Sequence, residues 1–246
     1  MRDVVRHLIS RWVPDAATRP GRALRWPLRA IPDEVAIPVL TGPNRGFRWI
    51  AGASVHGCWV GSYERQLADQ LWSGLSRGDV FYDVGANVGY YTLLGSRAVG
   101  PEGKVLAFEP LPRNLSYLHR HLALNGITNV DVVQAALLDH EGNVAFESEG
   151  GPSQARVSWD GSRTVAASTL DSLAIPPPNV VKMDVEGAEI KVLEGGIEML
   201  REHRPFLIFS THGSELRREC YHLLDSIGYD VRPLDVRASD HVAQPG

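Results

Sequence analysis

Residues 81–92 read Phe81-Tyr82-Asp83-Val84-Gly85-Ala86-Asn87-Val88-Gly89-Tyr90-Tyr91-Thr92, an apolar run that passes through a small-residue turn into a helical pattern. This order is typical of a β-strand that leads into an α-helix. Gly85 and Gly89 allow the backbone to approach a ligand closely, and the helix start offers free N–H groups to an anionic group. The stretch predicts a ligand-binding loop, although a tight turn could require the glycines for geometry alone.

Short apolar runs alternate with helix-length amphipathic segments after residue 80, which is typical of βαβ units and a mainly parallel sheet. The expected strands are Val80–Val84, Val105–Glu109, Val130–Val133, Val180–Asp184 and Phe206–Ser210. The expected helices cover residues 90–97, 112–125, 187–200 and 214–227. A further strand is expected at residues 229–234, running antiparallel to the others.

The chain divides into three parts around this pattern. Residues 1–60 are expected to form a basic N-terminal helix and an approach segment with short strands. Residues 61–236 are expected to form the ligand-binding domain, with an inserted β-hairpin or lid at about 138–168, and residues 237–246 a polar tail.

Composition restricts the function. The 246 residues contain 25 Lys and Arg against 29 Asp and Glu, a net charge of −4, which argues against nucleic-acid binding because phosphate affinity requires clustered positive charge. No apolar run is long enough for a transmembrane helix. Cys58 and Cys220 allow at most one disulfide and have no partners at metal-ligand spacing. We expect a soluble, cytoplasmic protein that acts on a small molecule.

The first 30 residues are strongly basic, with seven arginines and two aspartates. Apolar residues including Leu8 and Trp12 recur among these arginines at helical spacing, which predicts a basic amphipathic helix. Such a helix could contact a membrane surface. Packing on its own domain or on a second copy of the chain in a homodimer is the favoured interpretation.

An acidic residue, Glu109, ends the second expected strand, 20 positions after Gly89. A carboxylate at this point of a nucleotide-binding sheet accepts both hydroxyl protons of a ribose. The dinucleotide fingerprint needs glycine at its first, third and sixth places, which here hold Gly85, Asn87 and Tyr90. The spacing therefore disfavours NAD or FAD and fits a nucleoside with an amino-acid tail, such as S-adenosylmethionine.

Three more acidic residues follow the fourth expected strand: Asp184, Glu186 and Glu189. Carboxylates in a first helical turn are ordinary partners of the helix dipole, so Glu189 alone is interpreted as structural. Asp184 and Glu186 lie at the sheet edge where open α/β sheets bind ligands. Together with Asp83 and Glu109 they are expected to form an acidic cleft suited to a sulfonium cation.

Five motifs, in order, resemble those of the FkbM-type methyltransferases: Asp83-Val-Gly-Ala-Asn-Val-Gly, Ala107-Phe-Glu-Pro, Leu124-Asn-Gly, Thr169-Leu-Asp-Ser-Leu and Lys182-Met-Asp-Val-Glu-Gly-Ala-Glu. The resemblance spans about residues 60 to 230. It implies a class I, Rossmann-like α/β fold: a mostly parallel seven-stranded sheet with an antiparallel last strand and helices on both faces. It also implies S-adenosylmethionine-dependent O-methylation of a hydroxyl on a sugar, polyketide or other natural product.

The expected cofactor site combines the glycine loop with residues that the resemblance adds. In Gly-Ser-Tyr63-Glu64, the resemblance implies a segment that closes over the cofactor. The residues expected to bind it are Glu64, Asp83, Gly85, Ala86, Asn87, Gly89, Thr92, Glu109, Pro110, Asn114 and Asp184.

The catalytic residues are expected to be His212, Glu186 and Asp184. A base near its own pKa assists the attack of an alcohol, and His212 follows the fifth expected strand at the same sheet edge. Glu186 would assist proton removal, and Asp184 would orient the cofactor or acceptor. Capping of the next helix, or simple packing, is the alternative role for His212.

A divalent ion held by Asp184, Glu186 and His212 is a second alternative, not favoured because no spacing pattern demands it. The chain also departs from the family pattern at two positions. His121 replaces a frequent Asn, and Ser210 stands where an acid often precedes the histidine by two residues. His212 therefore lacks a charge partner nearby in sequence, although Glu186 could serve.

The leading hypothesis is a methyltransferase that acts on a small hydroxylated acceptor. An NAD-dependent oxidoreductase is the alternative from another enzyme class, weakened by Asn87 and Tyr90. A nucleoside-binding module without turnover, recruited to a partner by the basic helix, is the third interpretation.

Overall fold

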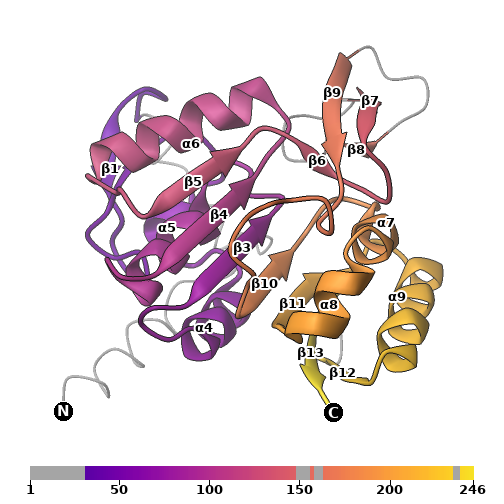
Figure 1. Ribbon diagram of the computed structural model, residues 1–246. Helices are drawn as coiled ribbons and strands as arrows, with labels where there is room; N and C mark the ends of the chain where they lie inside the picture. The colour runs from indigo at the N-terminus through magenta and orange to yellow at the C-terminus, as the bar shows by residue number, and fades with distance from the viewer. Residues whose placement is uncertain (1–30, 148–155, 158–162, 235–238) are drawn as a thin grey trace.

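The computed structural model describes residues 31–147, 156–157, 163–234 and 239–246. The basic helix expected in the first 30 residues lies outside them. The described chain builds a central sheet between two layers of helices (Figure 1). In spatial order its seven strands are β12 (Tyr229–Pro233), β13 (Asp240–Pro245), β11 (Phe206–Ser210), β10 (Val180–Met183), β3 (Val80–Val84), β4 (Lys104–Phe108) and β5 (Val130–Val133).

The last strand of this sheet, β13, is antiparallel to both its neighbours, and the other six strands share one direction. This arrangement confirms the expected fold class. The expectation of a polar tail at residues 237–246 is wrong, because β13 inserts between β11 and β12 and buries Val242 and Ala243. The expected orientation of residues 229–234 is also wrong, since β12 runs with the parallel strands.

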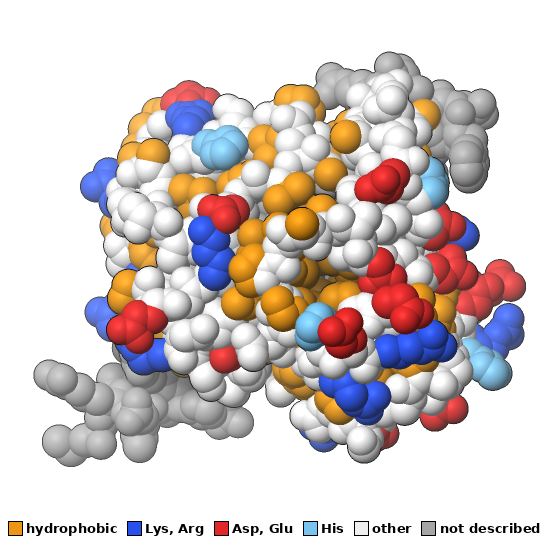
Figure 2. All heavy atoms as spheres, viewed as in Figure 1, with side chains coloured by type: hydrophobic (Ala, Val, Ile, Leu, Met, Phe, Trp, Pro, Cys, Tyr) orange, Lys and Arg blue, Asp and Glu red, His pale blue; other side chains and the backbone are white. Residues whose placement is uncertain are grey.

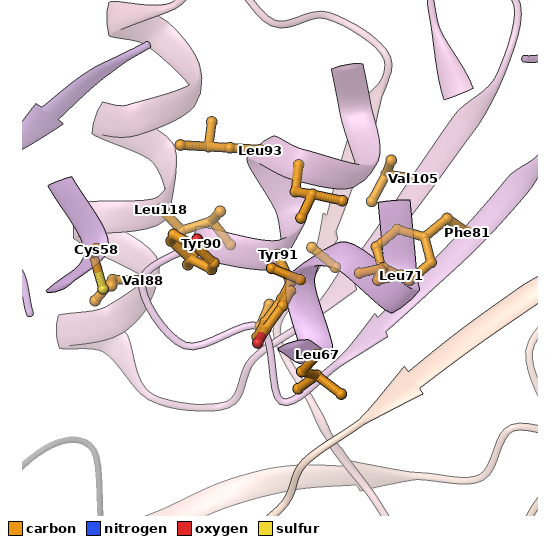
Figure 3. Packing of buried hydrophobic residues seen from close by; sticks show 14 of the residues in the cluster. Cys58, Leu67, Leu71, Phe81, Val88, Tyr90, Tyr91, Leu93, Val105 and Leu118 are labelled. Atoms are coloured by element: carbon orange, nitrogen blue, oxygen red, sulfur yellow. The ribbon is translucent and has the colours of Figure 1, made fainter. Parts of the chain in front are cut away.

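Apolar side chains alternate along the strands and divide the core between the two faces of the sheet. On one face pack α4 (Arg65–Gly74), α5 (Tyr90–Val99) and α6 (Pro112–Leu124). On the other pack α7 (Glu189–Glu194), α8 (Ile197–His203) and α9 (Ser214–Ser226). Figure 3 shows residues of the first cluster, with Leu71 of α4, Phe81 of β3 and Leu118 of α6 among them.

The helix expected at residues 187–200 is broken in two at Gly195 and Gly196. A Cβ on Gly195 would lie 1.9 Å from the carbonyl oxygen of Leu138, so only glycine allows this close approach. The second helix restarts where the carboxylate of Asp171 accepts the N–H groups of Glu198 and Met199. The long hydrophobic stripe therefore belongs to two short helices.

The approach segment consists of β1 (Ala36–Pro38), β2 (Arg48–Ile50) and the short helix α3 (Gly57–Val60), packed on α6 and α5. His121 joins these parts, because its Nε2 accepts the N–H of Ile50 and its Nδ1 donates to the carbonyl oxygen of Val88. Its ring stacks on Trp49, and burial lowers its pKa to about 4. The histidine at this unusual position is therefore a neutral packing residue.

At residues 138–168, where an inserted hairpin or lid is expected, β7 (Gly142–Glu147) pairs antiparallel with β9 (Arg163–Ser168). With β6 (Ala136–Leu137) and β8 (Arg156–Val157) these strands form a four-stranded sheet beside the main one (Figure 1).

Both cysteines are buried free thiols. None of the helices in the described ranges is long and apolar enough to cross a bilayer.

Candidate active site

A cavity of about 260 Å³ opens at the carboxyl ends of β3, β4 and β10. Figure 2 shows that hydrophobic side chains gather in the middle of one face of the molecule, with charged side chains mostly around them. The cavity is lined by the glycine loop after β3, the ends of β4 and β10, residues 135–137, and Ser54, Val55 and Cys58. Open α/β sheets bind ligands at this edge.

The glycine loop is shaped by its contacts with both neighbouring strands. The N–H groups of Gly85 and Ala86 donate to the carbonyl oxygen of Phe108 on β4. Gly85 has a φ of 77°, and a Cβ there would lie 1.9 Å from the carbonyl oxygen of Asp184. Asn87 also has a positive φ, 50°, which asparagine tolerates better than most residues. Glycine at position 85 is therefore required by the close approach of the loop to the backbone of Asp184.

The carboxylate of Glu109 ties this loop to the start of α6. One oxygen accepts the N–H of Asn87 at 2.9 Å, and the other accepts the N–H of Leu111 at 2.8 Å and the amide of Asn114 at 3.2 Å. Burial raises the pKa of Glu109, and the three hydrogen bonds oppose that rise. The residue expected to hold a ribose thus lines the cavity and also fixes the loop.

Asp83 lies beneath the cavity rather than on its wall. Its side chain is fully buried, accepts a hydrogen bond from Thr92 at 2.6 Å and lies 3.6 Å from Nζ of Lys182. Burial opposes the charge on Lys182, but the carboxylates of Asp83, Asp184 and Glu64 outweigh it and raise its pKa. Asp83 therefore neutralises a buried cation and contributes no wall to the acidic cleft that the sequence suggested.

The expected cofactor residues divide into lining and supporting groups. Those that line the cavity are Gly85, Ala86, Asn87, Glu109, Pro110, Asn114 and Asp184. Those that lie behind the lining are Glu64, Asp83, Gly89 and Thr92. Glu64 still reaches the wall indirectly, since it accepts a 2.6 Å hydrogen bond from the hydroxyl of Tyr91. Direct cofactor contact by the second group stays a prediction.

Sequence reasoning missed several lining residues. The apolar part of the wall includes Tyr63, Val84, Phe108, Leu111 and Leu137. The first three lie inside the motifs but were not expected to contact a ligand, and the last two lie outside them. Lys182 also lines the cavity. Its signal was present, because a charged residue inside the apolar run Val180–Met183 requires a buried partner.

His212 lies among three carboxylates beyond the end of β11. It is not one of the residues that line the cavity, but Asp184 and Glu186, which lie next to its ring, are. Its Nδ1 is 2.7 Å from Oε1 of Glu189, and its Nε2 is 3.2 Å from Oε2 of Glu186 and 3.8 Å from Oδ1 of Asp184. The structure thus unites the three expected catalytic residues. Ser210 offers no charge partner to His212, but the folded chain provides two, Glu186 and Glu189. The sequence alone suggested a structural role for Glu189.

The charges of this cluster are coupled. The hydrogen bond to Glu189, together with the nearby carboxylates, raises the pKa of His212 from 6.5 to about 9 despite its partial burial. Burial raises the pKa of Glu186, and His212 opposes that rise. At neutral pH the imidazole is therefore a cation held between carboxylates. The described helix α9 has no side-chain cap, so the alternative that His212 caps it is wrong.

One ligand-type atom from each of Asp184, Glu186 and His212 lies within 4.8 Å of the others. This spacing would allow a divalent ion to bind. The preference for metal-independent chemistry stays a prediction. His56, the histidine just before α3, is not among the lining residues, whereas Val55 and Cys58 are.

Comparison with known proteins places the chain among methyltransferases. Residues 83–232 match the model of the methyltransferase FkbM domain. The chain is 32% identical over 155 residues to the hexuronic acid methyltransferase AglP of Haloferax volcanii, covering 61% of this chain and 62% of AglP. It is 27% identical over 192 residues to the methyltransferase sdnD of Sordaria araneosa, covering 61% of this chain and 73% of sdnD. It therefore spans less than two thirds of AglP.

Solved structures share the fold at low identity. The methyltransferase FkbM from Methylobacillus flagellatus KT superposes with a TM-score of 0.53 at 22% identity, over 70% of this chain and 47% of that one. A ribosomal protein L11 methylase from Lactobacillus delbrueckii superposes with a TM-score of 0.51 at 14% identity, over 75% of this chain and 80% of that one.

Proposed function

Because the chain belongs to the FkbM methyltransferase family, we propose that it methylates a hydroxyl group of a sugar, polyketide or other natural product with S-adenosylmethionine as the donor. The observation that carries this proposal is one cavity lined both by the glycine loop and Glu109 and by Asp184 and Glu186, the carboxylates next to His212. This supports the proposal because a nucleoside bound at Glu109 would lie in the same cavity as an acceptor near His212.

The cavity fits the proposed donor. Glu109 lies at the strand end where a ribose diol is bound in related sheets, and Gly85, Ala86 and Asn87 line the cavity with it. Apolar residues such as Phe108 and Leu137 provide a wall against which an adenine ring would pack. When bound, S-adenosylmethionine supplies an electrophilic methyl group on a sulfonium.

The protein would contribute orientation and proton removal. Asp184 and Glu186 line the cavity beside His212, so an acceptor hydroxyl bound next to them would lie within reach of Nε2. His212 accepts the hydroxyl proton only in its neutral form. Glu186, whose side chain is partly exposed, orients the hydroxyl. Positioning and exclusion of water supply much of the rate in such displacements.

The acceptor class is proposed on two grounds. AglP is named for a hexuronic acid, and sdnD is also a methyltransferase. On this chain, the apolar side chains of Val55 and Cys58 line the same cavity as the carboxylates of Asp184 and Glu186. A sugar or polyketide presents both an apolar face and hydroxyl groups to such a mixed surface.

The test is transfer of a labelled methyl group from S-adenosylmethionine to a panel of hydroxylated sugars and polyketides, with each product identified by mass spectrometry. The proposal expects a gain of one methyl group on an oxygen of at least one acceptor, together with release of S-adenosylhomocysteine. Methylation on nitrogen or carbon alone would overturn the assignment to a hydroxyl.

A further inference from the structure

We propose that Glu189 is a positioning residue that holds the Nδ1–H of His212 and thereby presents Nε2 to the acceptor side of the cavity. This inference deepens the proposed function and rests on it, because it names the group that prepares His212 to accept a proton. Sequence position alone suggests a different role, that of an acidic partner for the helix dipole at the start of α7.

The first observation is the burial of the Glu189 side chain, which is fully removed from solvent. A carboxylate that only complements a helix dipole can remain in water, whereas a fully buried one needs a countercharge and hydrogen bonds. Oε1 receives both: it accepts the N–H of Gly187 at 3.0 Å and lies 2.7 Å from Nδ1 of His212. Oε2 is buried without a hydrogen-bond partner among the described residues. The imidazole is thus the group that compensates this carboxylate.

The second observation is the direction in which the other ring nitrogen points. Nε2 lies 3.2 Å from Glu186 and 3.8 Å from Asp184, and both of these residues line the cavity. The ring therefore has one edge on the buried Glu189 and the opposite edge next to two carboxylates that line the cavity. A histidine whose Nδ1–H is fixed by a carboxylate keeps its lone pair on Nε2 when neutral.

The third observation distinguishes Glu189 from Asp184 and Glu186, the other two carboxylates that face His212. The Glu186 side chain is 36% exposed and lies on the cavity side, where an acceptor would meet it. The sequence position that often holds an acid is occupied by Ser210, whose hydroxyl donates instead to Asp240, the first residue of β13. Glu189 is therefore the carboxylate that is both buried and bound to the nitrogen facing away from the cavity.

The experiment follows the ring nitrogens of His212 by ¹⁵N NMR in the full chain, with His212→Ala used to assign its signals among the nine histidines. In the wild-type protein above about pH 10, the proposal expects the neutral ring to carry its proton on Nδ1. In Glu189→Gln, the new amide can donate to Nδ1, so the proton is expected to move to Nε2. The pKa of His212 is expected to fall by about one to three units in that variant.

Matched variants separate positioning from general charge effects. Glu186→Gln is expected to lower the pKa of His212 while leaving the neutral proton on Nδ1. Glu194→Gln, an exposed carboxylate on the same helix, is expected to change neither quantity. Glu189→Asp should restore part of the wild-type tautomer preference. If Glu189→Gln does not fold, the tautomer of the wild-type ring still decides, because a neutral proton on Nε2 would overturn the proposal.

The readout keeps this inference separate from the proposed function, because the tautomer is measured without an acceptor or turnover. If an acceptor is methylated but the tautomer and pKa are the same in Glu189→Gln and wild type, the positioning role is wrong and the enzyme assignment stands. If the tautomer shifts as expected but no hydroxyl is methylated, the proposed function fails alone. With an acceptor in hand, Glu189→Gln should lower turnover while the affinity for S-adenosylhomocysteine stays within about twofold.

Discussion

Two regions of the site compensate the negative charge of their carboxylates differently. In the first, which we call the donor side because we propose that it binds the methyl donor, Glu109 accepts three N–H hydrogen bonds from Asn87, Leu111 and Asn114. In the second, which we call the acceptor side, the carboxylates of Glu186 and Glu189 face the imidazole of His212. Amide donors do not titrate, whereas an imidazole does. The donor side should therefore be insensitive to pH, and the acceptor side should change its charge as pH changes.

The largest expected effect is on turnover in His212→Ala. Loss of a general base lowers turnover by about 10²–10⁴-fold, and the affinity for S-adenosylhomocysteine should stay within about twofold because His212 lies outside the glycine loop. Steady-state kinetics and calorimetry measure the two quantities. His222→Ala, at an exposed histidine of α9, is the matched control. Wild-type turnover in His212→Ala would remove His212 from the base role.

A substitution on the donor side should mainly weaken the binding of S-adenosylhomocysteine and change turnover less. Glu109→Ala is expected to weaken S-adenosylhomocysteine binding by about 1.5–3 kcal/mol, since charge-assisted hydrogen bonds to the ribose and the loop are lost. Turnover at saturating donor should fall much less. Calorimetric titration measures the affinity, with Glu109→Gln as a milder variant and the exposed Glu102→Ala as control. Unchanged affinity would contradict the assignment of Glu109 to the ribose.

The pH dependence should separate the two sides directly. Because His212 must be neutral to accept a proton and its pKa is raised to about 9, kcat/KM should rise with pH and level off above about pH 9. Affinity for S-adenosylhomocysteine should stay nearly constant over the same range. A pH profile that is flat between about 6.5 and 9 would contradict the assigned role of His212.

The raised pKa of His212 also predicts how the stability of the fold changes with pH. The pKa of His212 is higher in the folded chain than its ordinary 6.5, so its ion pairs stabilise the fold fully below pH 6.5. This contribution is lost as the pH rises through about 9. Thermal unfolding of wild type and His212→Ala across this range measures it, and the difference between the two should shrink with increasing pH.

The smallest expected effect is that of chelation. If the His212 cation is the countercharge for Asp184 and Glu186, removal of divalent ions with EDTA should change turnover by less than about twofold. Assays with and without the chelator, followed by added Mg²⁺ or Mn²⁺, check this. Loss of turnover that returns with the metal would assign the three side chains to an ion.

The donor side was largely predictable from sequence because its geometry is local. The loop from Gly85 to Gly89 and the acid at Glu109 belong to one βαβ unit, whose spacing is fixed by strand and helix lengths. The position of β13 was not predictable in this way, since its apolar core is only Val242 and Ala243. Such a short run is recognised as a strand only once β11 and β12 flank it.

On the acceptor side, the sequence predicted which catalytic residues come together, but it did not predict that His212 pairs with Glu189. Asp184, Glu186 and His212 follow strands that lie side by side, so sheet topology brings them together. Glu189 is different, because the break after α7 and the packing of α7 on α9 decide that its carboxylate turns inward. The buried partner of Lys182 is likewise a tertiary feature, which no local spacing reveals.

We propose that the cavity lined by Gly85 and Glu109 binds S-adenosylmethionine. Isothermal titration of the purified chain with S-adenosylhomocysteine, NAD and ATP in parallel, at one salt concentration, is the decisive experiment. We predict saturable one-to-one binding of S-adenosylhomocysteine and none of the other two. Binding of NAD in its place, or of none of the three, would contradict the account.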